Sequence, residues 1–223
     1  MKDKIKYTLI LIIVFILIII FYLLYKIIQI IKEPFNNIPT VTFIIPTIGR
    51  ETLKNTLQSL KNQTHTNWKA IVIFDGIKPN IEENDPRINI IQIEKTGRLN
   101  YAGRVRNIGI LEVNTEWVAF VDDDDTITEN YLEIFENEVD VDVDLDVIIF
   151  RMLRGDEILP PLEHLDFVKN FVGISFCVKT RLFKNEYLWF NESATEDYDL
   201  LDVFRSKGKK IKLSKKITYL VNV

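Results

Sequence analysis

The stretch VTFIIPTIGRETLKNTLQSLKNQTHTNWKAIVIFDG, residues 41–76, reads as a strand, a turn, a helix and a second strand. The apolar runs at 41–45 and 68–74 have the length of buried strands. Between them, leucines recur at helical spacing over residues 51–63. A strand, a helix and another strand in succession form the repeating unit of a parallel sheet, so this stretch predicts an α/β fold.

The same alternation continues along the rest of the chain. We expect further strands at 88–93, 117–121, 147–150, 174–178, 210–213 and 217–221, and further helices at 102–113, 128–139 (with Thr128 as N-cap) and 196–207. This pattern predicts a mainly parallel sheet with helices on both faces. Such sheets bind ligands at the carboxyl ends of their strands. Polar residues follow three of the expected strands, namely Pro46 with Thr47, Asp75, and the tetrad Asp122–Asp125.

An apolar run near the N-terminus predicts a membrane anchor. Residues 7–25 read YTLILIIVFILIIIFYLLY without a charge, and the apolar character continues to Ile31. A helix needs roughly 20 apolar residues to cross a bilayer. A signal peptide would have a shorter apolar region followed by small residues, and a buried core helix is the other alternative. We expect a tail at 1–6, a transmembrane anchor at 7–31, a linker at 32–40 and a globular domain at 41–223.

The lysines that flank this run bear on its orientation. Three lysines precede the run and two follow it, which favours a cytosolic N-terminus. The sequence therefore predicts a single-pass membrane protein whose globular domain is luminal or extracytoplasmic. Two glycosylation sequons, at Asn62 and Asn191, are compatible with that location.

Charge and cysteine content exclude other classes of protein. The whole chain has a formal net charge of −4 and residues 1–33 contribute +3, so the remainder carries −7. An acidic domain is a poor partner for nucleic acid, because a phosphate backbone requires a basic surface. The single cysteine, Cys177, excludes an intrachain disulfide and a cysteine-based zinc site.

The tetrad Asp122–Asp125 is the strongest chemical signal. Four adjacent carboxylates repel one another unless a cation or solvent relieves the repulsion. Oxygen ligands suit Mg²⁺ or Mn²⁺, which also bind phosphate oxygens, so a metal site for a nucleotide is one interpretation. The alternative is a solvated acidic turn that caps the following helix.

Other polar residues have weaker claims. Asp75 could accept hydrogen bonds from a nucleobase or could be a turn residue before Gly76. Arg104 and Arg106 could each bind phosphate or could be surface charges. Aspartates alternate with apolar residues over 140–146, which we interpret as the approach to a strand because the glycine and glutamate of a calcium loop are missing.

Taken together, these segments resemble the family 2 glycosyltransferases, which have the GT-A fold. The resemblance covers about residues 40–221. It rests on TFIIPTIGRETLKNTLQSLKNQTHTNWKAIVIFDG at 42–76, on GRLNYAGRVRNIGILEVNTEWVAFVDDDD at 97–125, and on Thr195-Glu196-Asp197. The order and spacing of these three segments are specific, although each one alone is weak.

The resemblance implies a function and a set of site residues. It implies an inverting transfer of a sugar from a nucleotide-diphospho-sugar, expected to be a UDP-sugar, to a hydroxyl of a glycan, protein or lipid. The implied donor-binding residues are Pro46, Thr47, Asp75, Arg106, Asp122 and Asp123. Asp122-x-Asp124 resembles the family's metal-binding DxD, with Asp124 as the expected direct ligand of Mn²⁺ or Mg²⁺ and Asp122 nearer the ribose. Asp197 corresponds to the general base, with Glu196 beside it.

Two other functions are weighed against this one. A catalytically degenerate, membrane-tethered binding module is disfavoured because the tetrad and the Thr195-Glu196-Asp197 motif are both intact. A sugar-phosphate nucleotidyltransferase is disfavoured because residues 46–50 contain only one glycine, whereas such enzymes hold a triphosphate with a glycine-rich loop. The sequence lacks a Gln-x-x-Arg-Trp motif and has no histidine after His164, so processive synthesis and a C-terminal histidine ligand are not expected.

Overall fold

The computed structural model describes residues 15–26, 41–96, 101–142 and 144–222. The chain divides into two compact units, residues 1–38 and residues 39–223. Within the described ranges, no helix combines the length and the apolar character that a membrane span requires. Three of the expected segments lie wholly or partly outside the described residues: the tail at 1–6, the linker at 32–40 and the anchor, except for its residues 15–26.

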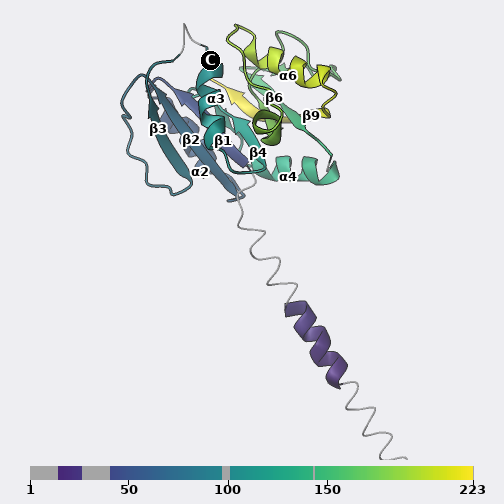
Figure 1. The fold of residues 1–223 in the computed structure, drawn as a ribbon. Helices are drawn as coiled ribbons and strands as arrows, with labels where there is room; N and C mark the ends of the chain where they lie inside the picture. The colour runs from purple at the N-terminus through teal and green to yellow at the C-terminus, as the bar shows by residue number, and fades with distance from the viewer. Residues whose placement is uncertain (1–14, 27–40, 97–100, 143, 223) are drawn as a thin grey trace, which may run out of the picture. The chain divides into compact units, whose positions relative to one another are not determined.

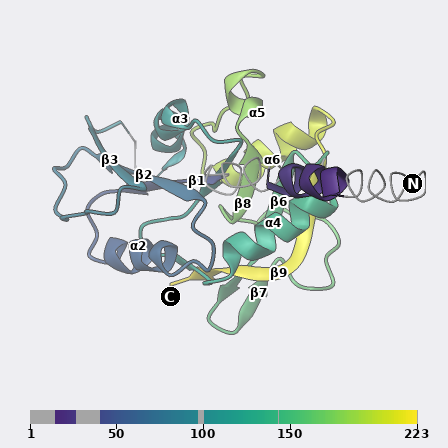
Figure 2. The same ribbon diagram turned by 90° about the horizontal axis from the view of Figure 1, so that it is seen from below.

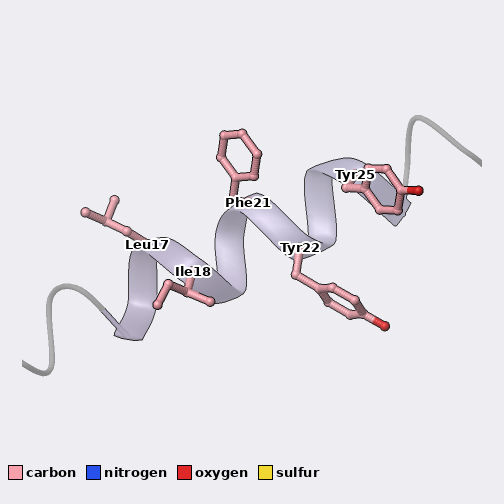
Figure 3. Close-up of a pocket in the computed structure, with 5 residues that line it drawn as sticks. All are labelled: Leu17, Ile18, Phe21, Tyr22 and Tyr25. Atoms are coloured by element: carbon pink, nitrogen blue, oxygen red, sulfur yellow. The ribbon is translucent and has the colours of Figure 1, made fainter.

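Residues 15–26 of the first unit form a helix whose side chains are exposed. Figure 3 shows five of these side chains along it: Leu17, Ile18, Phe21, Tyr22 and Tyr25. They line an open hollow that is almost entirely apolar, and every lining residue belongs to this one helix. The hollow is therefore a feature of the helix surface and not a ligand site of the globular unit.

The second unit is built on one sheet with helices packed against it (Figure 1). The strands are β1 (Val41–Thr47), β2 (Trp68–Asp75), β3 (Ile88–Ile93), β4 (Trp117–Phe120), β5 (Thr126–Ile127), β6 (Val147–Arg154), β7 (Glu157–Leu159), β8 (Phe176–Lys179) and β9 (Ile211–Val221). The helices are α2 (Leu53–Lys61), α3 (Gly103–Glu112), α4 (Tyr131–Val141), α5 (Arg181–Lys184) and α6 (Glu196–Ser206). Figure 2 shows α3 and α5 on one side of the sheet and α2 and α4 on the other.

The sheet is mixed, which corrects the prediction of a mainly parallel one. Its strand order is β3-β2-β1-β4-β8-β6-β9-β5, with β7 paired to β6. The pairs β1–β2, β2–β3, β1–β4 and β6–β9 are parallel, whereas β4–β8, β6–β8, β6–β7 and β5–β9 are antiparallel. Helical crossovers join β1 to β2 through α2 and β3 to β4 through α3, whereas residues 76–87 join β2 to β3 without a helix. A tight turn with Gly155 at φ +58° reverses the chain after β6, and such a turn gives an antiparallel pair.

Two local predictions near α4 are also wrong. The helix begins at Tyr131, and Thr128 is not its N-cap. The side chain of Gln63 fills that place, because its Oε1 accepts the N–H of Leu132 at 3.1 Å while its Nε2 donates to the Thr128 carbonyl at 2.7 Å. The helix then continues through Asp140 to Val141 and gives way to a turn, so the alternating aspartates are not a strand approach.

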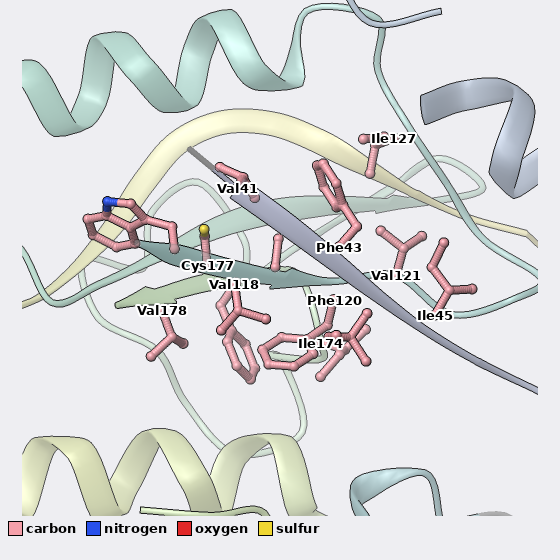
Figure 4. Packing of buried hydrophobic residues seen from close by; sticks show 14 of the residues in the cluster. Val41, Phe43, Ile45, Val118, Phe120, Val121, Ile127, Ile174, Cys177 and Val178 are labelled. Carbon is pink, nitrogen blue, oxygen red and sulfur yellow. The ribbon is translucent and has the colours of Figure 1, made fainter. Parts of the chain in front are cut away.

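The core lies where β1, β4 and β8 run side by side (Figure 4). All seven residues of β1 and all four of β4 are buried. Continuous apolar runs of this kind are typical of strands covered on both faces. Cys177 on β8 is fully buried among them, and this burial raises the pKa of its thiol. The cysteine is therefore part of the core packing.

The parallel half of the sheet determines where the polar residues meet. β1 is in register with β2, pairing Thr47 with Phe74, and with β4, pairing Ile44 with Phe120. The carboxyl ends of all three strands therefore lie at one edge of the sheet. Thr47, Asp75 and the tetrad Asp122–Asp125 are brought to this edge, as the sequence predicts.

Candidate active site

Two loops are joined at the carboxyl edge by Asp123. Thr47, the last residue of β1, donates from Oγ1 to Asp123 Oδ2 at 2.5 Å. Arg50, three residues later, donates from Nη1 to Asp123 Oδ1 at 2.6 Å. The side chain of Asp123 is only 4% exposed, so its carboxylate faces these groups and not solvent. Asp123 thus fastens the loop after β1 to the loop after β4.

The four aspartates of the tetrad have four different sets of partners. Asp122 accepts from Arg106, Asp123 from Thr47 and Arg50, Asp124 from Arg50, and Asp125 from the Asn222 N–H and the Tyr219 hydroxyl. The repulsion expected between neighbouring carboxylates is therefore relieved by two arginines, hydroxyls and a backbone donor. Burial raises the pKa of Asp125 to about 6, which marks it as an inward-facing carboxyl.

Asp124 is the member of the tetrad that is most open to a ligand. Its side chain is 41% exposed, compared with 36% for Asp122. Partial burial raises the pKa of Asp124, the Arg50 guanidinium opposes this, and the carboxylates of Asp122 and Asp123 add to it. An exposed carboxylate oxygen that lies beside other carboxylates is a suitable ligand for a hard divalent cation.

The donor set fits a cation that brings its own phosphate ligands. In the part of the chain that the structure describes, no group of three or more His, Cys, Asp or Glu side chains is arranged to hold a metal. Mg²⁺ usually binds through one or two carboxylates, water and substrate phosphates, and does not need a full protein cage. Asp124 and Asp122 could therefore hold Mg²⁺ or Mn²⁺ together with a diphosphate.

A buried arginine on α3 connects the tetrad to α6. Nη2 of Arg106 donates to Asp122 Oδ1 at 2.6 Å, and Nη1 donates to Glu196 Oε1 at 2.6 Å and to Asp197 Oδ1 at 3.4 Å. Its side chain is 4% exposed. Burial would lower the pKa of Arg106, but the charges of Asp122, Asp197 and Glu196 outweigh it and raise the pKa, so the guanidinium stays charged. The predicted metal segment and the predicted base are thus joined through one side chain.

Glu196 is held by the start of α3. Its Oε1 accepts the N–H of Ala102 at 3.2 Å in addition to the bond from Arg106, and its carboxylate also accepts from the N–H of Gly103. A carboxylate at this position satisfies the free N–H groups of a helix N-terminus and is favoured by the helix dipole. Glu196 is therefore a buried cap that fixes α3 against α6.

Asp197 lies beside Glu196 but in a different environment. Its side chain is about 25% exposed, and among the described residues its carboxylate accepts one side-chain hydrogen bond, the long one from Arg106. Burial raises the pKa of Asp197 to about 7, Arg106 opposes the shift, and the charges of Asp122 and Glu196 add to it. A partly exposed carboxyl with a pKa near neutrality is suited to accept a proton.

The other predicted site residues, Asp75, Arg104 and Pro46, lie in three different environments. Asp75 ends β2 and accepts the N–H of Thr96 at 2.8 Å, with 8% of the residue exposed. Arg104 is a surface charge, since its side chain is 58% exposed and lies 3.7 Å from Glu192. Pro46 lies within β1 and not in a turn. Roles for Pro46 and Asp75 in donor binding stay predictions.

Sequence reasoning missed two residues at this edge. Arg50 was part of the quoted turn, but nothing in its local sequence indicates a bond to Asp123 or Asp124. Tyr219 lies 97 residues from Asp122 in the sequence, yet its hydroxyl oxygen accepts the N–H of Asp122 at 3.1 Å. Burial raises the pKa of the Tyr219 hydroxyl. Only a β9 strand placed next to β5 brings Tyr219 there, and that pairing has no local signal.

The mixed sheet, with its acidic carboxyl edge, defines the class of the fold, which is an α/β fold of the GT-A-like type. Residues 42–198 match the family model described as glycosyl transferase family 2. The chain therefore belongs to the glycosyl transferase family 2.

Named relatives agree with that assignment. EpsH of Bacillus subtilis, which carries a glycosyltransferase name, is 36% identical over 103 residues, covering 43% of this chain and 29% of EpsH. TarS 1–349 of S. aureus superposes with a TM-score of 0.66 at 19% identity, covering 82% of this chain and 60% of that one. The mannosyltransferase PcManGT of Pyrobaculum calidifontis, solved with GDP-Man and Mn²⁺, has a TM-score of 0.59 at 12% identity, covering 82% and 56%.

The solved neighbours bear on the fold alone at these identities. TarS 1–349 has also been solved with UDP and with UDP-GlcNAc. The chain spans less than two thirds of each of these relatives, and only 29% of EpsH.

Proposed function

We propose that the globular unit transfers a sugar from a UDP-sugar to an acceptor hydroxyl with inversion at the anomeric carbon, using Mg²⁺ or Mn²⁺. The observation that carries the proposal is the link through Arg106 between Asp122 and Asp197. In this link Asp122, assigned to the donor site, accepts from Nη2 of Arg106, and Asp197, assigned as the base, accepts from Nη1 of the same guanidinium. A single displacement needs such an arrangement, because donor and base must be held in fixed relation.

Donor binding is assigned to the carboxyl edge. Asp75 accepts from Thr96 through Oδ1, which leaves its other carboxylate oxygen, Oδ2, to accept from the N–H of a uracil base. Pro46 and Thr47, at the end of the neighbouring strand β1, are assigned the adjoining donor contacts. Arg106 acts on the donor indirectly, because its two terminal nitrogens, Nη1 and Nη2, are committed to Glu196, Asp197 and Asp122. Asp122 is oriented by this bond toward the sugar side, and Asp123 keeps the two loops together.

The metal site is assigned to Asp124 with Asp122. A divalent cation there would neutralise charge on the departing diphosphate. Both carboxylates are more than a third exposed, so water and phosphate oxygens can complete the ligand set. A neighbour of the same fold has been solved with Mn²⁺ and a nucleotide-sugar, which supports the choice of metal.

Asp197 is assigned the role of general base. Its carboxylate takes the proton of the acceptor hydroxyl as the hydroxyl oxygen bonds to the anomeric carbon. The bond between that carbon and the diphosphate oxygen breaks in the same step, and the nucleoside diphosphate leaves with its electrons. Glu196 does not share this task, because it caps α3 and is 8% exposed. A positioned base of this kind contributes roughly 10²–10⁴-fold to the rate.

A panel of nucleotide-sugars tests the function. The full chain in detergent is incubated with Mn²⁺ and each donor, with and without glycan, protein and lipid acceptors. Acceptor-dependent release of UDP, with an inverted anomeric configuration of the product by NMR, is the expected result. Donor binding without any turnover would favour a degenerate binding module. Formation of a nucleotide-sugar from a nucleoside triphosphate and a sugar phosphate would favour a nucleotidyltransferase.

We also propose that residues 7–31 anchor the chain in a membrane as a single span, with the globular unit luminal or extracytoplasmic. In the described helix, Phe15 is 64% exposed and Phe21 is 78% exposed. Apolar side chains so exposed along a whole helix are unfavourable in water and favourable in lipid. A chain that begins at Asn36 should then be soluble, whereas the full chain should need detergent. Digestion of the globular unit from the cytosolic side of sealed vesicles would contradict the orientation.

A further inference from the structure

Arg50 lies in a loop at the carboxyl edge of the sheet that hydrogen bonds hold in place. The preceding residue, Gly49, has φ +85°, its N–H donates to Thr47 Oγ1 at 2.9 Å, and its carbonyl accepts from the Asn80 side chain at 2.9 Å. These bonds fix the backbone immediately before Arg50. The side chain of Arg50 is nevertheless 46% exposed, so it can move while the loop stays in place.

A single nitrogen of Arg50 bridges two aspartates. Nη1 lies 2.6 Å from Asp123 Oδ1 and 2.9 Å from Asp124 Oδ2. One positive centre between two carboxylate oxygens is also the arrangement that a bound cation would adopt. Among the described residues, Arg50 is the one side chain that forms an ion pair with Asp124.

The two halves of this bridge differ in strength. Asp123 is buried and also held by Thr47, so it keeps a partner if Arg50 leaves. The Arg50–Asp124 half joins two side chains that are 46% and 41% exposed. Such exposed ion pairs are weak, because water screens them. A divalent cation accompanied by a diphosphate can therefore displace Arg50 from Asp124 at small cost.

We propose that Arg50 is a stand-in cation that holds Asp123 and Asp124 in the donor-free protein and turns to the diphosphate when a metal ion takes Asp124. The planar guanidinium, once released, is suited to bind two phosphate oxygens. The consequence is coupling: the metal alone must compete with Arg50, whereas metal and nucleoside diphosphate together give Arg50 a new partner. The inference rests on the proposed function and adds a residue and a regulation to its donor site.

The experiment measures Mn²⁺ binding without turnover. Free Mn²⁺ is followed by electron paramagnetic resonance in the full-length chain, first alone and then with saturating UDP. Arg50→Gln should bind Mn²⁺ alone about tenfold more tightly than wild type, and should bind UDP at saturating Mn²⁺ about tenfold more weakly, which is within the usual range of coupling between two ligands. Unchanged Mn²⁺ affinity in Arg50→Gln would overturn the inference.

Two further variants separate charge from shape and from general surface effects. Arg50→Lys keeps a positive charge but lacks the planar guanidinium with two terminal nitrogens. It should therefore still suppress binding of Mn²⁺ alone, but recover UDP affinity only in part. Lys54→Gln is the matched control, because Lys54 is exposed, lies four residues away and pairs only with Glu51 in the described structure. It should match wild type in both measurements, and a response equal to that of Arg50→Gln would overturn the inference.

The same data separate this inference from the proposed function. If wild type binds Mn²⁺ with UDP and Arg50→Gln is indistinguishable from it, only the role of Arg50 fails. If no variant binds Mn²⁺ with UDP, the metal-dependent donor site fails and the role of Arg50 fails with it.

Discussion

The carboxylate of Glu196 lies directly against the α-carbon of Gly103. A β-carbon at Gly103 would be 2.6 Å from Glu196 Oε2 and 2.7 Å from the carbonyl oxygen of Asn191. Only glycine lets the start of α3 approach α6 this closely. The same contact brings the N–H groups of Ala102 and Gly103 to the Glu196 carboxylate. The geometry around Arg106 therefore depends on a residue that has no side chain.

Gly103→Ala should destabilise the protein. The new methyl group has to displace a backbone carbonyl as well as a side-chain oxygen, and overpacking of this kind costs about 1–3 kcal/mol. Thermal unfolding should show a lower melting temperature. Leu111→Ala on the same helix, where the side chain is 59% exposed, is the control and should have little effect. A melting temperature of Gly103→Ala equal to that of wild type would mean that α3 can shift freely.

Asp124→Asn should abolish divalent-dependent binding of the nucleotide and leave the fold intact. An amide is a poor ligand for a hard cation that the carboxylate would hold, and the side chain is 41% exposed, so packing is unaffected. Isothermal titration of UDP with and without Mn²⁺ measures the effect, and circular dichroism checks the fold. Wild-type affinity in the variant, or full wild-type activity in EDTA, would remove Asp124 from the metal site.

The parallel half of the sheet and its polar edge could be predicted because their signals are local. β1, α2 and β2 lie within 41–75, and each of the two strands is mainly apolar. The half of the sheet that contains the antiparallel pairs could not be predicted in the same way. β8 enters between β4 and β6 from a later part of the chain, so its direction depends on pairing and not on its own residues.

The candidate site shows the same division. Asp122, Asp124, Glu196 and Asp197 were identified from short motifs. Their relation to one another depends on Arg106, whose local sequence alone favours a surface charge over a site residue. Burial of an arginine between α3, α6 and the tetrad arises only from tertiary packing. Glu196 and Asp197 are adjacent but have different roles, because Glu196 faces the start of α3 and Asp197 does not. This difference also arises only from tertiary packing.

Asp197→Asn should retain donor and metal affinity and lose transfer by roughly 10²–10⁴-fold, the usual contribution of a general base. Asparagine has nearly the shape of aspartate but cannot take the proton. Steady-state kinetics should show the loss in kcat, with UDP and Mn²⁺ affinity unchanged. Parallel loss of UDP binding would instead make Asp197 a donor ligand or a structural residue, and transfer near the wild-type level would make Glu196 the next candidate.

The raised pKa of Asp197 also predicts how stability depends on pH. The pKa is about 7 in the folded protein, against an ordinary value of 3.8. Between these values the folded state binds a proton that the unfolded state has lost, so the contribution of this group to stability falls as pH rises from about 4 to about 7. Asp197→Asn should therefore show a shallower decline of stability over this window in urea unfolding. An unchanged slope would contradict the raised pKa.

Arg106→Lys should move the pH dependence of transfer upward. Arg106 is the group that opposes the rise of the Asp197 pKa, and lysine cannot donate to Asp122 on one side and to Glu196 and Asp197 on the other. Lysine keeps one positive charge but carries it on a single ammonium that cannot reach both sides, so it should stabilise the Asp197 carboxylate less well than Arg106 does. Asp197 should then lose its proton only above the wild-type pKa of about 7, and the acid limb of kcat/KM should shift to higher pH. Asp122→Asn should shift the limb in the opposite direction, because the Asp122 charge helps to raise the Asp197 pKa.

Arg104→Lys, at an exposed position two residues earlier on the same helix, is the control and should leave the limb in place. Identical pH profiles in all four proteins would show that Arg106 supports the fold without tuning the base.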